Sequence, residues 1–376
     1  MDRTAVARAT KLQSLYADYG QSPWLDNLTR AQLHDGSLAR MVGNGIRGVT
    51  ANPTIFARSI TGSSEYDEQF AELIAAGSSV AEAYWELVVE DVRQALAVLR
   101  PLFDASNSAD GFVSVEVSPA LAHDAPATVA AARWLSRRIN QPNLLVKIPA
   151  TSAGVAAVET LTAEGSSINV TLLFSLSRYA QIIEAYQSGL ERFVLNGGDP
   201  STVNSVASFF VSRVDTEVDR RLEAIGTDEA LALRGEAAVA QAKLAYKLFT
   251  DRFSTDRWQR LGRLGADVQR PLWASTSSKS PRTRDTRYVE ELIGADSVTT
   301  LPEPTVAAFE DHGVLARTVD TELPRASEVM SRLVALGIDL DDVGRALEVN
   351  GIAAFDAAYD DVLTDLSGAA RQASRH

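Results

Sequence analysis

Short runs rich in β-branched and apolar residues alternate with longer helical stretches along most of the chain, from about Ser22 to Leu301. The stretches between the short runs repeat apolar residues at three- and four-residue spacing, the period of a helix with one buried face. Such alternation is typical of a parallel sheet, and eight strands suit a closed (β/α)8 barrel. The predicted strands are residues 24–28, 48–50, 112–117, 144–148, 168–172, 206–211, 272–275 and 297–300.

Helical segments fill the intervals, and two of them lie outside the regular alternation. Residues 228–253 are predicted as one helical stretch, longer than a single crossover requires, and residues 325–366 as helical hairpins that close the chain. No internal repeat or Pro/Gly/Ser linker separates two halves. We therefore predict one domain over 1–376: a (β/α)8 TIM barrel of the α/β class, with extra helices between strands 6 and 7 and a C-terminal helical extension, 325–376. Its regular helices are predicted at 80–99, 127–139, 179–190 and 214–225.

Polar residues interrupt three of the predicted strands on the face that the barrel turns inward. Strand side chains alternate between two faces, so one set points to the helices and the other to the interior. In residues 112–118 three valines share one face and Glu116 lies on the other. The same rule places Lys147 inside, near the C-terminal end of its strand, together with Asn169 and Thr171 of the next strand. Three strands thus deliver polar groups to one mouth of the barrel.

Lys147 is the candidate nucleophile of this mouth. A lysine in an apolar strand is costly to bury in its charged form, which favours the neutral amine, a nucleophile toward a carbonyl carbon. This is the chemistry of a Schiff-base (class I) aldolase. Alternatively, Lys147 forms a structural ion pair with Glu116 or lies on an exposed edge strand. The strand alone leaves these interpretations open.

Five short segments form an ordered set of motifs: GVTANPTIF at 48–56, VSVEVS at 113–118, LVKIPAT at 145–151, NVTLLF at 169–174 and SFFVSR at 208–213. The whole set identifies a protein family far more specifically than any one segment does. Their order and spacing, from Trp24 to about Glu310, resemble those of the transaldolase family. The long form of that family, which ends in helices beyond the barrel, fits better than the shorter fructose-6-phosphate aldolases.

The resemblance implies roles for four catalytic residues. Lys147 forms the Schiff base with the C2 carbonyl of a ketose phosphate, and Asp26 matches the aspartate that removes the C4 hydroxyl proton during carbon–carbon cleavage. Glu116 exchanges protons through a water held by Thr171 as the carbinolamine forms and collapses. Taken singly, Asp26 also fits a helix N-cap or a solvated turn, and Glu116 and Thr171 fit interior hydrogen-bonding residues.

The resemblance also implies substrate-binding residues. Asn52 and Asn169 hold the dihydroxyacetone hydroxyls, although an Asn-Pro turn alone explains an asparagine before proline. Ser208 and Arg213 bind the phosphate end of the substrate, and Ser275 joins them from the next loop. A (β/α)8 barrel often binds phosphate with its late loops, where an arginine or lysine meets hydroxyl and backbone donors.

The sequence departs from the family after Ser275. Many relatives carry an arginine two residues later, whereas Ser277 stands here and Lys279 follows. We expect Lys279 to substitute for that arginine. The alternative is that Lys279 and the arginines at 282, 284 and 287 form a solvated basic stretch that opens the next helix.

Composition narrows the remaining choices. The 376-residue chain has no cysteine, which excludes disulfides, thiolate metal sites and cysteine nucleophiles, and its four histidines show no metal-binding spacing. A net charge of −13 opposes nucleic acid or an anionic membrane as the main partner. The N-terminus lacks the apolar core of a signal peptide, and no apolar run approaches the ~20 residues of a membrane span. We expect a cytoplasmic protein without metal or organic cofactor, monomeric or homodimeric.

The predicted activity is transfer of a dihydroxyacetone unit from sedoheptulose 7-phosphate to glyceraldehyde 3-phosphate, giving erythrose 4-phosphate and fructose 6-phosphate. One alternative is an aldolase that releases free dihydroxyacetone, although Phe210 favours transfer because the short aldolases usually carry tyrosine there. Another is a non-catalytic sugar-phosphate-binding barrel. A nicotinamide dehydrogenase would rest only on the G-x-G-x-x-G pattern at 43–48, which follows a predicted helix and leads into a strand, the reverse of a dinucleotide fingerprint.

Overall fold

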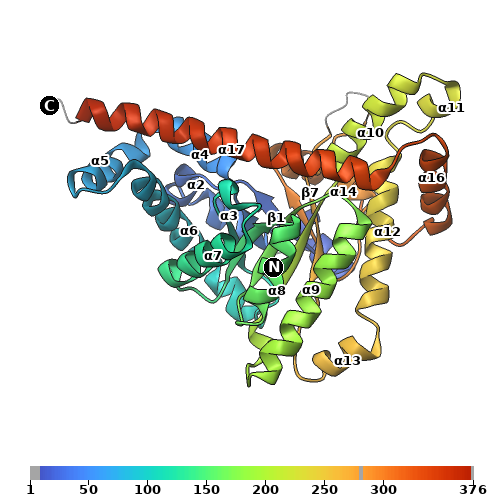
Figure 1. Cartoon of the computed structure of the whole chain (residues 1–376), viewed down its shortest axis with the longest axis horizontal. Helices are drawn as coiled ribbons and strands as arrows, with labels where there is room; N and C mark the ends of the chain where they lie inside the picture. The colour runs from blue at the N-terminus through green and yellow to red at the C-terminus, as the bar shows by residue number, and fades with distance from the viewer. Residues whose placement is uncertain (1–8, 279–282, 374–376) are drawn as a thin grey trace, which may run out of the picture.

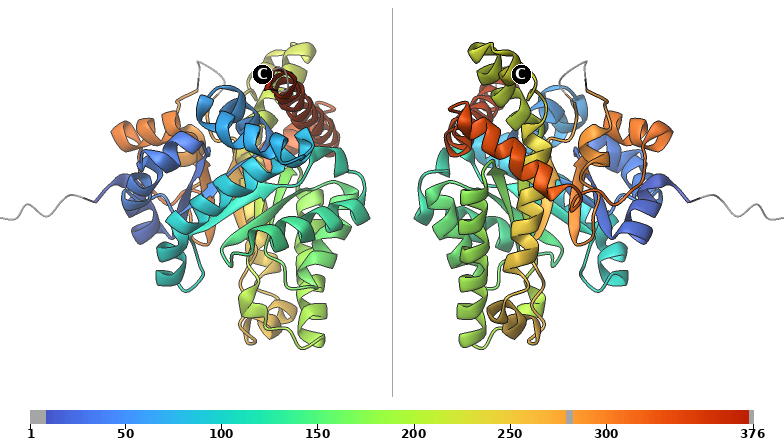
Figure 2. Two further views of the ribbon diagram at one scale, coloured as in Figure 1. Left: turned by 90° about the vertical axis from the view of Figure 1, so that its left-hand side faces the viewer. Right: turned by 90° about the vertical axis from the view of Figure 1, so that its right-hand side faces the viewer.

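Eight parallel strands form a closed barrel in which β8 pairs with β1. The computed structural model describes residues 9–278 and 283–373. Helices surround the barrel, so the structure is the predicted (β/α)8 fold, and Figure 2 shows it from two further sides. The strands are β1 Gln21–Asp26, β2 Gly48–Thr50, β3 Phe112–Glu116, β4 Leu144–Pro149, β5 Ile168–Leu173, β6 Ser205–Phe210, β7 Arg270–Ala274 and β8 Ser297–Leu301.

All eight predicted strands are present, but the first was placed too late. It spans Gln21–Asp26 instead of residues 24–28 because Gln21 pairs with Ser297 of β8 and its buried side chain donates to the Leu292 carbonyl at 2.7 Å. A prediction that ends a strand at its polar residues misses polar residues that are paired inside the sheet. At the other end, Thr29 already acts as the N-cap of the next helix.

The four regular helices were predicted correctly but are longer than expected, whereas the stretch 228–253 is not one helix. It divides into α11 Asp228–Leu231 and α12 Ala237–Arg252. Gly235, between them, has a left-handed φ of +74°, a conformation that ends a helix and favours glycine. The regular helices are α6 Val80–Ala105, α7 Ala125–Ile139, α9 Leu176–Leu195 and α10 Ser212–Ile225.

The C-terminal helices do not form the predicted hairpins. Helix α16 (Leu323–Ala335) packs on α12, whereas α17 (Leu340–Ala373) is a single 34-residue helix that packs mainly on α4 (Pro53–Thr61) and α10. Figure 1 shows α17 crossing one end of the barrel. Gly337, with φ +80°, lies in the turn between the two helices. Helix α17 therefore covers part of the end of the barrel at which the strands finish.

One large hydrophobic cluster joins barrel, surrounding helices and C-terminal helices, from Leu12 to Leu366. None of the helices in the described ranges is long and apolar enough to cross a membrane.

Helix α3 ends at Gly43 and β2 begins at Gly48, so the glycine pattern at 43–48 connects a helix to a strand, opposite to a dinucleotide fingerprint. The remaining elements are α1 Lys11–Tyr19, α2 Arg30–His34, α3 Ser37–Gly43, α5 Asp67–Ala75, α8 Ser152–Thr162, α13 Asp256–Gly262, α14 Arg287–Glu290, α15 Glu303–His312, and the 3-10 helices η1 Ser64–Tyr66, η2 Pro119–Leu121 and η3 Pro200–Thr202.

Candidate active site

A cavity of about 960 Å³ opens where the barrel strands end. In a (β/α)8 barrel this face carries the active site in essentially every characterised enzyme. Strands β1, β2, β4, β6, β7 and β8 contribute to its wall, and helices α4, α10, α15 and α17 complete it. Six of the residues predicted from the sequence as catalytic or substrate-binding line this cavity, together with the neighbouring Phe210: Asp26, Asn52, Lys147, Ser208, Arg213 and Ser275.

Lys147 and Glu116 form an ion pair inside the barrel. The two residues are register partners on β4 and β3, and Lys147 Nζ lies 3.2 Å from Glu116 Oε2. Their side chains are 5% and 1% exposed, and β4 lies between β3 and β5, so the alternative of an exposed edge strand is wrong. Burial raises the pKa of Glu116, while Lys147 and then Arg213 lower it. Burial is the largest of these effects, so the pKa of Glu116 lies above its usual range.

On β5, the strand next to Lys147, hydrogen bonds fix the side chain of Asn169 inside the barrel. Asn169 is the register partner of Lys147; its amide donates to Ser114 Oγ at 2.9 Å and its carbonyl accepts from Ser208 Oγ at 2.7 Å. Thr171, two residues later, is fully buried, and its hydroxyl has no hydrogen-bond partner among the described residues. Apart from the ion pair with Lys147, the carboxylate oxygens of Glu116 likewise have no hydrogen-bond partner among the described residues. Buried polar atoms of this kind are usually satisfied by ordered water.

Asp26 lies at the last position of β1 and faces the cavity. Thr50, its register partner on β2, donates a hydrogen bond from Oγ1 to Asp26 Oδ1 at 3.0 Å. The interpretation of Asp26 as a helix N-cap is wrong, because Thr29 caps α2. For Asn52 the local interpretation is correct: its side chain caps α4 by accepting from the Ile55 backbone N–H at 3.0 Å. The Asn52 amide NH2 remains a donor at the cavity wall.

Arg213 is the second residue of α10 and lies half-buried at the cavity wall. Its guanidinium carbon lies 5.2 Å from the centre of the Phe210 ring. Burial lowers the pKa of Arg213, whereas Asp26 and Glu116 raise it. Within the described parts of the chain, no carboxylate lies within ion-pair distance of this guanidinium. The cation is thus available to an anion that enters the cavity.

The loop after β7 approaches Arg213 from the neighbouring strand. Ser275 has a left-handed φ of +57°, and its hydroxyl lies 2.8 Å from the hydroxyl of Ser212. Ser277, which stands where many relatives carry arginine, also lines the cavity. Lys279, the predicted substitute for that arginine, lies outside the described residues, so its role stays a prediction.

Helix α4 contributes a wall that the sequence analysis did not identify. Thr54, Ile55, Arg58 and Ser59 line the cavity from one face of this helix, at helical spacing. Once a helix is predicted to begin after Asn52, its periodicity places these residues together. Phe355 of α17 also lines the cavity, but no pattern in the sequence connects it with a barrel strand.

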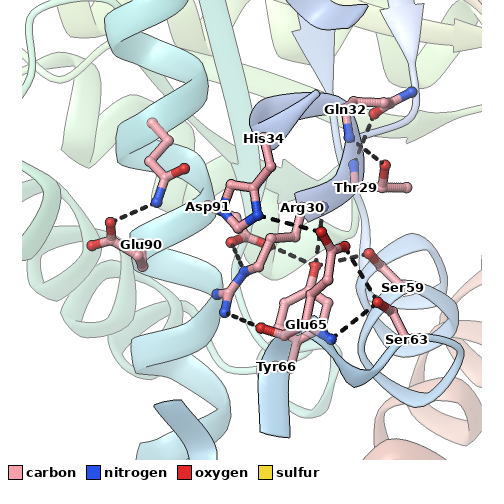
Figure 3. Close-up of polar contacts among 11 residues, drawn as sticks. Thr29, Arg30, Gln32, His34, Ser59, Ser63, Glu65, Tyr66, Glu90 and Asp91 are labelled. Atoms are coloured by element: carbon pink, nitrogen blue, oxygen red, sulfur yellow. Dashed lines mark hydrogen bonds and ion pairs between the residues drawn. The ribbon is translucent and has the colours of Figure 1, made fainter. Parts of the chain in front are cut away.

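A buried polar network holds the α4 wall in place (Figure 3). Arg30 Nε donates to Asp91 Oδ1 at 2.8 Å, and the side chains of both are almost fully buried. Tyr66 donates from its hydroxyl to Asp91 Oδ2 at 2.7 Å and lies under the Arg30 guanidinium, 4.0 Å from ring centre to Cζ. Ser59 Oγ is 2.8 Å from the Tyr66 hydroxyl. The network thus joins α2, η1 and α6 to the cavity wall.

No group of three or more His, Asp or Glu side chains in the described ranges is arranged to hold a metal ion. The site instead combines a buried amine, two carboxylates in different surroundings, an unpaired hydroxyl and an arginine. Such a set supports amine attack on a carbonyl with proton exchange.

Comparison with known proteins identifies related sequences. The family model "Transaldolase/Fructose-6-phosphate aldolase" matches residues 23–366. A transaldolase of Parafrankia sp. (strain EAN1pec) is 47% identical over 346 residues, which cover 92% of this chain and 94% of the relative. A transaldolase of Arthrobacter sp. (strain FB24) is 47% identical over 363 residues, or 95% and 98% of the two chains. Transaldolase 1 of Streptomyces coelicolor is 47% identical over 361 residues, or 96% and 94%.

Proposed function

The chain belongs to the transaldolase/fructose-6-phosphate aldolase family and catalyses the transaldolase reaction, and we propose that Lys147 carries this reaction as a Schiff base. The reaction transfers a dihydroxyacetone unit from sedoheptulose 7-phosphate to glyceraldehyde 3-phosphate and belongs to the non-oxidative pentose phosphate pathway. The single observation that supports the assignment best is the buried Lys147–Glu116 pair, 3.2 Å apart, of which Lys147 lines the same cavity as Asp26 and Arg213.

The first proposed step is attack of the Lys147 amine on the C2 carbonyl of the ketose phosphate. The lysine must give up a proton to become a nucleophile, and Glu116 is the acceptor within reach. Because burial raises the pKa of Glu116, the carboxyl can hold that proton and then return it to the hydroxyl that leaves as the carbinolamine collapses. A water between Glu116 and the unpaired hydroxyl of Thr171 would relay these protons.

Carbon–carbon cleavage follows in the proposed sequence. Asp26 accepts the proton of the C4 hydroxyl, the C3–C4 bond breaks, and the electron pair moves into the iminium to form an enamine on Lys147. The aldose phosphate leaves, an acceptor aldehyde takes its place, and enamine C3 attacks its carbonyl carbon while Asp26 returns the proton to the new hydroxyl. Thr50 holds the carboxylate in position for both transfers. Asn52 and Asn169 would hold the dihydroxyacetone hydroxyls, Asn52 through its amide donors.

The phosphate group is proposed to bind between the sixth and seventh strands. Arg213 supplies a guanidinium without an ion-pair partner in the described residues, and Ser275 supplies a hydroxyl at the cavity wall. Ser208, whose hydroxyl donates to Asn169 in this structure, would turn its proton toward the phosphate when the substrate binds. An arginine can bind phosphate with two parallel hydrogen bonds. We keep Lys279 as the proposed second cation of this subsite.

Release of free dihydroxyacetone is the competing outcome of the same chemistry. Phe210, which lines the cavity near Arg213, offers no hydroxyl to position a water molecule near the enamine, and this favours transfer. The test is incubation with fructose 6-phosphate, with and without erythrose 4-phosphate, followed by quantification of products. We expect sedoheptulose 7-phosphate in the presence of the acceptor and little dihydroxyacetone in its absence. Equal rates of dihydroxyacetone release in both samples would favour the aldolase instead.

We also propose that the chain works in the cytoplasm as a monomer or homodimer. The absence of cysteine and the acidic composition support the location. Cell fractionation tests it, and light scattering coupled to size-exclusion chromatography distinguishes 40.4 kDa from twice that mass.

A further inference from the structure

The hydroxyl of Ser59 stands at the meeting point of the catalytic cavity and the buried network. Ser59 lines the cavity from α4, and its Oγ lies 2.8 Å from the Tyr66 hydroxyl. Tyr66 itself is 1% exposed and belongs to the interior. A surface serine would turn its hydroxyl freely, whereas this one has a fixed neighbour.

The number of protons that each group of the network can donate fixes the direction of each hydrogen bond. Asp91 accepts from Arg30 Nε at 2.8 Å, an ion pair that keeps its carboxylate charged, so Asp91 can only accept from Tyr66. A phenol has one proton, and Tyr66 gives it to Asp91 at 2.7 Å. The Tyr66 oxygen therefore acts as an acceptor toward its other neighbours, including the Arg30 backbone N–H at 3.3 Å. Consequently Ser59 must be the donor in its contact with Tyr66.

A serine whose only proton is engaged in the interior presents acceptor lone pairs to the other side. We propose that Ser59 is a substrate-binding residue that accepts a hydrogen bond from a hydroxyl of the sugar phosphate, and that Tyr66 and Asp91 are positioning residues that orient it. The chemical class of ligand is a hydroxylated aldose phosphate or the corresponding part of the ketose donor. The subsite rests on the proposed function, because it adds recognition to the same cavity.

This subsite differs in chemistry from the phosphate end of the cavity. A serine oriented as an acceptor repels phosphate oxygens, whereas it accepts from a hydroxyl. Arg58 lies next to Ser59 and also lines the cavity, so any effect on phosphate binding through this neighbour would appear with every phosphorylated substrate. The number of hydroxyls in the substrate therefore separates the two effects.

The experiment compares acceptors that all carry an aldehyde and a phosphate but differ in hydroxyls. Glycolaldehyde phosphate has none between these groups, glyceraldehyde 3-phosphate has one and erythrose 4-phosphate has two. Transfer from fructose 6-phosphate to each 13C-labelled acceptor is measured as label in the ketose product for the wild-type chain, Ser59→Ala and Ser59→Thr. The label is needed because transfer to glyceraldehyde 3-phosphate regenerates fructose 6-phosphate. For Ser59→Ala we expect kcat/KM to fall roughly two- to tenfold for at least one hydroxylated acceptor, the usual range for loss of one hydrogen bond, and to stay unchanged for glycolaldehyde phosphate. Ser59→Thr should restore most of the loss.

The orienting role of Tyr66 is tested by a double-mutant cycle. Tyr66→Phe removes the acceptor that holds the Ser59 proton, so it should weaken the same hydroxyl preference. Added to Ser59→Ala, it should change that preference no further. The matched control is Ser22→Ala, because Ser22 Oγ donates at 2.8 Å to Asp110, the carboxylate of another buried arginine network, at the opposite end of the barrel. The control should leave the acceptor profile unchanged.

Three results would overturn the proposal. Equal losses for all three acceptors in Ser59→Ala would mean that the residue supports the fold or the phosphate, and unchanged kcat/KM for all three would mean that it binds nothing. Additive effects of the Ser59 and Tyr66 changes on hydroxyl preference would contradict the orienting role. Failure of the wild-type chain to transfer to any acceptor would be a different result, which contradicts the transaldolase assignment and the subsite together.

Discussion

Replacement of Arg213 by glutamine tests how the cavity recognises phosphate. Its guanidinium is half-buried against Phe210 and has no ion-pair partner among the described residues, although burial lowers its pKa. A cation kept in such a place without a counter-ion is costly for the fold. We therefore expect Arg213→Gln to leave the melting temperature unchanged or slightly higher, and to affect substrate binding instead.

The magnitude follows from the contact that is lost. A hydrogen bond to a charged group contributes about 1.5–3 kcal/mol, so loss of the Arg213–phosphate contact should lower kcat/KM for fructose 6-phosphate by roughly 10- to 150-fold. Fructose carries no phosphate, so we expect its kcat/KM to be lower and to change less than about threefold in the variant. The ratio of the two values therefore reports the phosphate contact alone.

The assay measures transfer to erythrose 4-phosphate from fructose 6-phosphate and, at high enzyme concentration, from fructose. Arg58→Gln is the matched control, because Arg58 is a second arginine on the cavity wall but lies on α4. An equal loss for both donors in Arg213→Gln would refute a role in phosphate binding. A selective loss in Arg58→Gln alone would place the phosphate on the opposite wall.

Three further predictions concern the acid–base pair, a buried aspartate and the fold. Glu116→Gln should lower kcat by about 10²–10⁴-fold, the usual contribution of a general acid–base group; a loss under tenfold would contradict its role. Asp215 has a pKa raised by burial from 3.8 to about 6, so its contribution to stability is complete below pH 3.8 and lost as the pH rises through 6. Asp215→Asn should remove about 3 kcal/mol of this decline, measured by urea unfolding from pH 4 to 7.5; an identical pH profile of wild type and variant would contradict the shift. Calorimetry should show one unfolding transition, because α16 and α17 share the core of the barrel; a separate transition would mark the C-terminal helices as a second domain.

The barrel and the buried polar residues of its interior were predictable because strand periodicity fixes which side chains face inward. Glu116, Lys147 and Asn169 lie on successive strands, and their register brings them side by side. This agrees with the alternation of side chains between the two faces of each strand. Where polar residues are paired inside the sheet, as at Gln21, the same pattern placed the strand boundary too late. The break at Gly235 was missed because one glycine weighs little in a long helical period, although its left-handed backbone ends the helix.

The rest of the cavity depends on contacts that a one-dimensional pattern does not contain. Phe355 reaches the cavity only because α17 crosses the barrel end, more than 200 residues after the Lys147 strand. Ser59 is an ordinary helical serine in the sequence, and its importance arises from Tyr66 and Asp91, which pack behind it. Long-range packing thus decides which polar residues of a helix belong to the site.

The central claim is that the Lys147 side chain becomes covalently bonded to the dihydroxyacetone unit. Borohydride reduction in the presence of fructose 6-phosphate, followed by peptide mass mapping, measures this directly. We predict that the peptide containing Lys147 gains the mass of a reduced dihydroxyacetone adduct, and that Lys147→Met forms no adduct and has no transfer activity. Unmodified Lys147 in wild-type protein that turns over its substrate, or transfer by Lys147→Met, would contradict the account.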